Sequence, residues 1–293
     1  TSDVDFKKKL MTFTVVGAGF AGVETMGEIN YLVRESVKNF YPSIGKENIS
    51  MNLVASEEFI LPELGPKLGK DAGKYLRKAG VNVITNTKAV DTGEDFVELD
   101  NGEKIPCMTL IWAAGVVIDP IVSSLKCKHD KSGKLKVAKY LRLTEYENVF
   151  ALGDCALITN PSTGKAYPPT AQNSIHQSAT VANNLYSMIT GKTKLKEFSF
   201  ESKGMMTTLG RRVAIAIVYG LHFKGSLAWL IWRTYYLYKL PMLEKRFQVA
   251  TSWIADLLFK RDLTFVGKIK KKSLTKINIK SDMPSIKDLF KDL

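Results

Sequence analysis

Three glycines near the start of the chain, Gly17, Gly19 and Gly22, are spaced two and three residues apart. In a loop with this spacing, the first glycine makes a tight turn, the second lets the backbone approach a pyrophosphate, and the third lets a helix pack closely on a strand. The pyrophosphate then lies over the helix N-terminus, where free N–H groups and the helix dipole favour an anion. The spacing predicts a dinucleotide site, provided that a strand precedes the loop and a helix follows it.

The residues around the glycines supply those two elements. Residues 12–16 are largely apolar, which is typical of a strand inside a parallel sheet. After the loop, a helix is expected to start near Val23. Further strands are expected at 51–54, 81–84 and 109–115, a helix at 71–79 that ends at Gly80, and a hairpin over 97–105 with a glycine turn. The alternation predicts an α/β, Rossmann-like nucleotide-binding domain over residues 10–118.

Two glutamates follow the second expected strand, where an acidic residue commonly accepts hydrogen bonds from an adenosine ribose. Val54 is followed by Ala55-Ser56-Glu57-Glu58, so Glu57 or Glu58 is the candidate. No arginine lies beside them to receive a 2′-phosphate, which favours NADH over NADPH. The alternative is that both are solvated loop charges.

A second motif, Gly153-Asp154, follows the apolar residues 149–152, which we expect to form a short buried strand. The glycine lets a ligand approach the backbone, and the short carboxylate is suited to a ribityl hydroxyl or to a place near a pyrophosphate. On its own the pair is equally consistent with an ordinary turn. Its position downstream of a complete glycine loop favours a second cofactor site.

Charge and aromatic residues are concentrated towards the C-terminus. The 293 residues carry a net charge of +13, which favours a polyanionic partner. Residues 226–280 contain two aromatic, amphipathic segments and then a basic tail, the pattern of helices at an anionic membrane surface. The alternative is that these helices pack on the protein or on a partner chain. The aromatic segments include Leu227, Trp229, Leu230, Trp232, Tyr235, Tyr236, Tyr238, Phe247, Trp253 and Ile254.

Several classes of protein are disfavoured. The most apolar run, 227–240, is too short to span a bilayer and carries Arg233 in its middle. The cysteines, Cys107, Cys127 and Cys155, have no metal-ligand spacing, so no metal site is expected, and their odd number fits a reducing compartment.

Read together, these motifs resemble the type II NADH dehydrogenases, the non-proton-pumping NADH:quinone oxidoreductases, which are pyridine nucleotide-disulfide oxidoreductase-like flavoproteins. The resemblance covers residues 8–265. The matching segments are 10–17, Gly22-Val23-Glu24, 111–116, 150–156, Pro168-Pro169-Thr170-Ala171-Gln172 with His176-Gln177, and Lys203-Gly204 with Leu209-Gly210.

The resemblance implies an FAD-dependent enzyme of the respiratory chain that passes electrons from NADH to a membrane quinone. It implies a peripheral location on the cytoplasmic face of the cell membrane and no nucleic acid partner, and it leaves a homodimer open. The implied catalytic residues are Glu24 and Lys203. The implied cofactor-binding residues are Gly17, Gly19, Phe20, Ala21, Gly22, Glu24, Glu57, Ala114, Gly115, Gly153, Asp154, Ala171 and Gln172, and the implied quinone site is Gln172, His176 and Gln177.

The chain departs from this family in two places. His176 stands where the family has a glutamine. The earlier FAD-binding half, with its own glycine loop, does not precede the first residue, so we expect the chain as given to bind FAD poorly. The expected division is an NADH-binding domain (10–118), a remnant of a second, FAD-binding Rossmann-like domain (119–195), a quinone-side, amphipathic helical membrane-binding region (196–265) and a basic tail (266–293).

Two other functions stay open on the sequence. A sulfide:quinone oxidoreductase needs a cysteine pair beside the flavin, and the three cysteines form no evident pair. A non-catalytic nucleotide- or lipid-binding module is consistent with the missing FAD half.

Overall fold

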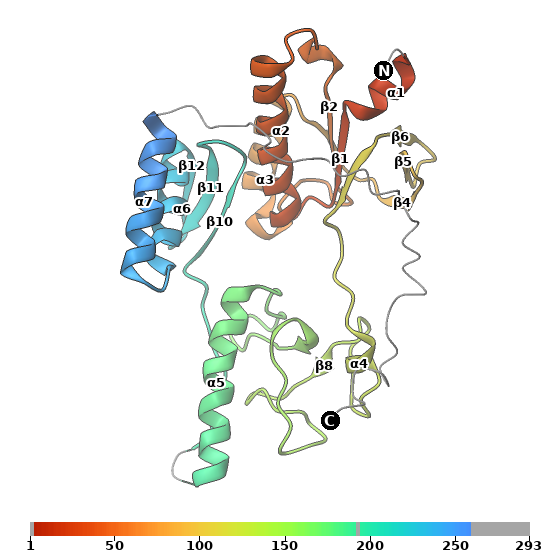
Figure 1. Ribbon diagram of the computed structural model, residues 1–293. Helices are drawn as coiled ribbons and strands as arrows, with labels where there is room; N and C mark the ends of the chain where they lie inside the picture. The colour runs from red at the N-terminus through yellow and green to blue at the C-terminus, as the bar shows by residue number, and fades with distance from the viewer. Residues whose placement is uncertain (1–2, 192–193, 259–293) are drawn as a thin grey trace, which may run out of the picture. The chain divides into compact units, whose positions relative to one another are not determined.

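A four-stranded parallel sheet organises the first part of the chain in the computed structural model, which describes residues 3–191 and 194–258 (Figure 1). The strand order is β3-β2-β1-β7, as expected for a βαβ domain. The elements are α1 (Val4–Leu10), β1 (Thr12–Val16), α2 (Phe20–Phe40), η1 (Lys46–Asn48), β2 (Ser50–Val54), η2 (Pro62–Leu64), α3 (Gly65–Lys78), β3 (Asn82–Ile84) and β7 (Thr109–Trp112).

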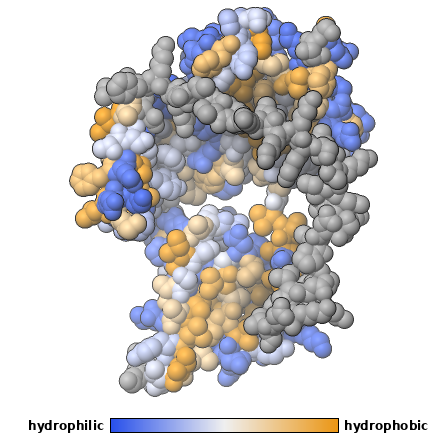
Figure 2. Space-filling view, in the orientation of Figure 1, coloured by the Kyte–Doolittle hydropathy of each residue, from blue (hydrophilic) through white to orange (hydrophobic). Residues whose placement is uncertain are grey.

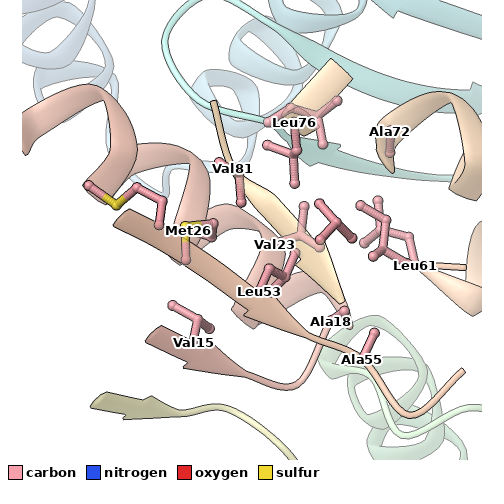
Figure 3. Packing of buried hydrophobic residues seen from close by; sticks show 14 of the residues in the cluster. Val15, Ala18, Val23, Met26, Leu53, Ala55, Leu61, Ala72, Leu76 and Val81 are labelled. Atoms are coloured by element: carbon pink, nitrogen blue, oxygen red, sulfur yellow. The ribbon is translucent and has the colours of Figure 1, made fainter. Parts of the chain in front are cut away.

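The main hydrophobic core lies between this sheet and its helices. Figure 3 shows Val15 and Leu53 from the two central strands together with Val23 and Met26 from α2 and Leu76 from α3. Val23, Met26, Leu53 and Leu76 are completely buried. Each such side chain contributes about 1.5–3 kcal/mol of burial energy, which fixes α2 firmly against the sheet.

A small antiparallel sheet covers another part of the parallel sheet. It consists of β4 (Ala89–Thr92), β5 (Phe96–Leu99) and β6 (Lys104–Pro106). Gly102 has φ +83° in the turn between β5 and β6, so the expected hairpin is confirmed. Val97 and Leu99 of β5 form a second core cluster with Val16 and Val54.

The segment around Gly153-Asp154 has much less regular pairing. Its elements are α4 (Pro120–Ser123), β8 (Leu135–Lys136), η3 (Gly153–Cys155), β9 (Ala156–Leu157) and α5 (Ala171–Thr190). The prediction of a regular strand at 149–152 is wrong. Phe150 forms an isolated bridge with Arg142, and the Ala151 N–H donates to the Leu141 carbonyl at 3.0 Å. Regular pairing begins only after the Gly-Asp turn, where β9 pairs with β8 over two residues.

A third sheet packs on α2. It is antiparallel and contains β10 (Gly204–Thr208), β11 (Ala214–Val218) and β12 (Leu221–Gly225). Ile215 belongs to the same core cluster as Val23. A Cβ on Gly27 would lie 2.5 Å from the Leu209 carbonyl carbon, so only a glycine there lets α2 approach the end of β10 so closely.

Two helices follow the third sheet, as the sequence predicts: α6 (Ser226–Lys239) and α7 (Leu243–Leu258). Ala228 of α6 is completely buried against Ala214 and Ala216 of β11, so one face of α6 packs on the protein itself. Across the described residues, no helix combines the length and apolarity that crossing a bilayer requires. The chain divides into two compact units, residues 1–251 and 252–293, and the predicted basic tail lies outside the described residues.

Candidate functional site

The glycine loop joins the end of β1 to the start of α2, and close contacts fix its shape. Gly17 has φ +101°, and a Cβ there would lie 2.7 Å from the Ala113 carbonyl carbon. A Cβ on Gly22 would lie 1.7 Å from the Gly17 carbonyl oxygen. The Gly17 N–H donates to the Val54 carbonyl at 2.9 Å. The loop is therefore held against the ends of β2 and β7 by its own backbone.

Gly19 differs from its two neighbours in the motif because it faces open space. It is the N-cap of α2 and supplies no side-chain acceptor. A Cβ there would meet no atom closer than Oε1 of Glu63, at 3.6 Å. Phe20 and Ala21 follow in the first turn of α2, whose N–H groups lack intrahelical partners. This opening at a helix N-terminus fits a dinucleotide pyrophosphate, which a larger side chain at Gly19 would displace.

The predicted ribose residues lie in the connection after β2, and the predicted β7 residues directly follow the end of β7. Glu58 forms an exposed ion pair with Lys70 at 2.7 Å. Glu57 is exposed, and its carbonyl accepts from the Asn86 N–H at 3.0 Å. Ala114 and Gly115 follow the end of β7, where Gly115 has φ +79° and a Cβ would have no neighbour within 4 Å.

Glu24 lies inside a polar contact between α2 and β10. Its Oε1 accepts from the Thr207 hydroxyl at 3.0 Å and from the Thr208 N–H at 3.1 Å. Both threonines are buried. Burial and, secondarily, the charge of Glu24 raise the pKa of Tyr236 on α6. Because α2 begins at Phe20 rather than near Val23, Glu24 lies beyond the first turn, where the helix dipole has less effect on it.

Lys203 is placed apart from this cluster. It is exposed, directly before β10, and its carbonyl accepts from the Tyr219 N–H at 2.8 Å. Thr207 and Thr208, which contact Glu24, lie at the other end of β10, roughly 13 Å away at strand geometry. The strand therefore separates Lys203 from Glu24.

The Gly-Asp turn is held by a residue that was predicted to contact quinone. The Gly153 N–H donates to Oε1 of Gln177 at 2.8 Å, and Gln177 is only 3% exposed. Gly153 has φ +73°, and a Cβ there would lie 3.3 Å from the Ser174 hydroxyl. Asp154 is exposed and free to meet a ligand from solvent.

α5 begins at Ala171, soon after Pro168-Pro169, and the hydroxyl of its N-cap, Thr170, accepts from the Asn173 N–H at 3.3 Å. Ala171 is exposed and Gln172 half-buried. His176 is exposed and stacks on Phe200, with ring centroids 4.0 Å apart.

A small cleft lies between the Gly-Asp turn and the start of α5. Lys134, Gly153, Ser174 and Gln177 are among the residues that line it. Backbone N–H groups at the helix start and the lysine suit a small polar or anionic group. The cleft has a volume of only about 10 Å³, so its residues suit a contact with the edge of a flavin's polar chain rather than enclosure of the cofactor.

Sequence reasoning missed three contributors: the buried threonines on Glu24, the bond from Gly153 to Gln177, and the approach of Glu63 to Gly19. Each joins residues far apart in sequence, for example 183 residues for Glu24 and Thr207. Local periodicity carries no signal of such contacts.

Comparison with known proteins identifies the relatives of this chain. The family model described as pyridine nucleotide-disulphide oxidoreductase matches residues 1–178. A probable NADH dehydrogenase of Dictyostelium discoideum is 30% identical over 261 residues, 88% of this chain and 56% of that protein. The type II NADH:quinone oxidoreductase Ndh of Mycobacterium tuberculosis is 29% identical over 271 residues, 89% of this chain and 57% of that protein.

Solved structures share the fold. The structure of NDH2 from Plasmodium falciparum in complex with NADH superposes with a TM-score of 0.78 at 19% identity, covering 90% of this chain and 69% of that one. The chain spans about half the length of the curated relatives it matches.

Proposed function

Since the chain belongs to the pyridine nucleotide-disulphide oxidoreductase family, we propose that it is the NADH-binding part of an FAD-dependent type II NADH:quinone oxidoreductase. The observation that carries the proposal is the open position at Gly19, over the free N-terminus of α2. The curated relatives named as NADH dehydrogenases or NADH:quinone oxidoreductases support this activity over other members of the family.

The residues divide between two cofactors. Gly17, Gly19, Phe20, Ala21 and Gly22 would hold the NADH pyrophosphate, while Ala114 and Gly115 would border the dinucleotide at the end of β7. Gly153, Asp154, Ala171 and Gln172 would contact FAD, with Gln177 positioning Gly153 through its amide.

A flavin held by these residues would supply the redox chemistry, hydride acceptance from NADH and two-electron reduction of quinone. The protein itself would position the nucleotide against the flavin and exclude water from the site. Glu24, held by Thr207 and Thr208, would keep a proton acceptor at a fixed place on α2. Lys203 and His176 would border the quinone side. The proposed domains are the NADH-binding domain (10–118), the FAD-binding remnant (119–195), the quinone-side and membrane-binding region (196–265) and the basic tail (266–293).

The quinone is dissolved in lipid, so we include a peripheral membrane contact through residues 226–280, on the cytoplasmic face. Exposed apolar side chains support it. The most exposed in α6 and α7 are Leu227, Leu230, Tyr238, Leu243, Phe247 and Ile254, at 56–72%. Arg233 and Arg246 stack on Trp229 and Tyr238, which places cations beside the aromatic rings.

The sulfide:quinone alternative is less well supported. Cys107 is buried in a core cluster, and burial raises the pKa of its thiol. Burial likewise raises the pKa of Cys127. Both shifts work against the thiolate that disulfide chemistry requires.

The test of the proposed function uses the purified 293-residue chain. NADH binding is measured by fluorescence titration, and NADH oxidation by a short-chain quinone is measured with and without added FAD. Saturable NADH binding and flavin-dependent oxidation support the proposal. Absence of NADH binding by a folded chain would refute it.

The membrane contact needs a separate test, because removing residues 226–280 would also uncover the sheet that Ala228 covers. The variant Leu243→Ser/Phe247→Ser changes exposed residues of α7 instead, and Ile189→Ser on α5 is its control. Losing each large apolar contact should weaken vesicle binding by about 1.5–3 kcal/mol. Vesicles of phosphatidylcholine with phosphatidylglycerol, in low and high salt, separate this loss from charge attraction. Equal binding of both variants would remove the membrane role of α7.

A further inference from the structure

An exposed carboxylate, Glu63, faces the glycine loop from the segment that connects β2 to α3. Its Oε1 is the nearest atom, at 3.6 Å, to a Cβ built on Gly19. Among the described residues, Glu63 has no hydrogen bond or ion pair. The carboxylate therefore stands beside the proposed pyrophosphate position with its oxygens free to accept.

The segment around Glu63 is held rigidly. The Leu61 N–H donates to the Ala18 carbonyl at 2.8 Å, which ties the segment to the glycine loop. Leu61 adopts φ +54°, is completely buried, and its carbonyl accepts from the Leu64 N–H at 2.9 Å. Leu61 and Leu64 are both part of the main core. Glu63 thus projects from a turn whose two flanking leucines are anchored.

The other acidic groups of this connection are less well placed. Ala55, which directly follows β2, is buried and has no carboxylate. Glu58 is neutralised by Lys70 at 2.7 Å. Glu57 follows Ala55 by two residues, and its carbonyl is bonded to the loop after β3. Of these acidic groups, Glu63 is the one whose carboxylate lies beside Gly19, 3.6 Å from the position of a Cβ there.

We propose that Glu63 is the residue that recognises the adenosine ribose of NADH and disfavours NADPH. This rests on the proposed NADH binding at the glycine loop. A carboxylate beside a pyrophosphate would be repelled unless it meets a donor, and the ribose hydroxyls are such donors. Of the two riboses that flank the pyrophosphate, the adenosine ribose is the one that an acidic residue following the second strand contacts in dinucleotide-binding folds. NADPH replaces one hydroxyl with a phosphate of about −1.5 to −2 charge, which repels Glu63.

The experiment measures Kd for ADP-ribose and for its 2′-phosphate on the full 293-residue chain, by isothermal titration calorimetry without added flavin. Glu63→Gln keeps the size of the side chain and removes its charge. Glu28→Gln removes the same charge from an exposed site on α2, nine residues or about 13 Å along the helix from Gly19.

Glu63→Gln should reduce the preference for ADP-ribose over its 2′-phosphate by about tenfold or more, the size of a hydrogen bond to a charged group. Glu28→Gln should leave the preference unchanged. A preference retained in Glu63→Gln, or lost in Glu57→Gln instead, would overturn the role of Glu63 while leaving NADH binding intact. If the unmodified chain binds neither ligand, both the proposed function and this inference fail.

Discussion

The nucleotide-binding lobe (residues 12–112) and the Gly-Asp lobe (residues 119–200) hold their glycine turns in different ways. In the first, backbone meets backbone, since a Cβ on Gly22 would lie 1.7 Å from the Gly17 oxygen. In the second, a side-chain amide 24 residues away, Gln177, accepts from the Gly153 N–H. A backbone contact that only glycine permits is visible in the sequence as a glycine motif. A contact made by a distant side-chain amide has no such sequence pattern.

The two lobes also differ in what surrounds these turns. β1 is paired along its length with β2 on one side and β7 on the other. In the Gly-Asp lobe, β8 and β9 pair over two residues each, and α5 leaves apolar side chains exposed. Figure 2 shows hydrophobic surface in the region where Figure 1 places α5. The exposed side chains there are Ile175, Leu185, Tyr186, Met188 and Ile189. The second lobe therefore has less buried area to resist local opening.

The largest expected effect comes from Gly22→Val. Its side chain would overlap the Gly17 carbonyl, so α2 must move away from the loop, at a cost of about 3 kcal/mol or more. Thermal unfolding should show a lower Tm, and NADH binding should be lost with it.

Gly19→Val separates binding from folding at the same loop. The nearest atom to a new Cβ is 3.6 Å away, so the Tm should change little. NADH binding should nevertheless be lost, because the side chain fills the pyrophosphate position. An unchanged NADH affinity in a fluorescence titration of Gly19→Val would remove the assignment of this loop.

Native-state hydrogen exchange should order the two lobes by stability. Amides of β1 and β2 should exchange only on global unfolding, and those of β8 and β9 through local opening. At least about a tenfold difference in protection is expected, which corresponds to 1.4 kcal/mol. Equal protection in both lobes would mean that they unfold as one unit, and the contrast drawn from their pairing would be wrong.

The nucleotide lobe was largely predictable because its signals are local. The strands at 12–16, 51–54 and 81–84, the hairpin with Gly102 and the glycine loop follow from apolar runs and glycine spacing. The predicted start of α2, near Val23, is three residues too late, because Phe20 to Gly22 are already helical.

The rest depends on contacts between distant residues. The apolar run at 149–152 was predicted as a strand, but a strand needs neighbours along its whole length, and a single sequence does not show them. Similarly, Thr207 was not recognised as a partner of Glu24, because that contact exists only once the third sheet packs on α2.

Gln177→Ala should have a smaller effect, confined to the Gly-Asp lobe. Removing the amide leaves the Gly153 N–H without its acceptor, which costs about 1–3 kcal/mol. Exchange of the Gly153 amide should accelerate, and NADH affinity should not change. Asn183→Ala, at an exposed site on the same helix, is the control. If NADH affinity falls with Gln177→Ala but not with Asn183→Ala, the Gly-Asp lobe is energetically coupled to the NADH site, and the two lobes do not act independently.

The smallest expected effect concerns the contact of the nucleotide lobe with the third sheet and α6. Burial raises the pKa of Tyr236, and the charge of Glu24 adds to the shift. Glu24→Gln keeps an oxygen for Thr207 and Thr208 and removes the charge, so the pKa of Tyr236 should fall but stay above its ordinary value. When folding raises the pKa of a tyrosine, the folded state loses stability as the pH rises above the ordinary tyrosine pKa. Glu24→Gln should therefore unfold less readily at alkaline pH than the unmodified chain.

Ultraviolet titration of the tyrosines, with Tyr236→Phe to isolate the signal, measures the shift. An unchanged Tyr236 titration in Glu24→Gln would show that the carboxylate does not reach α6, and the cluster would end at the two threonines.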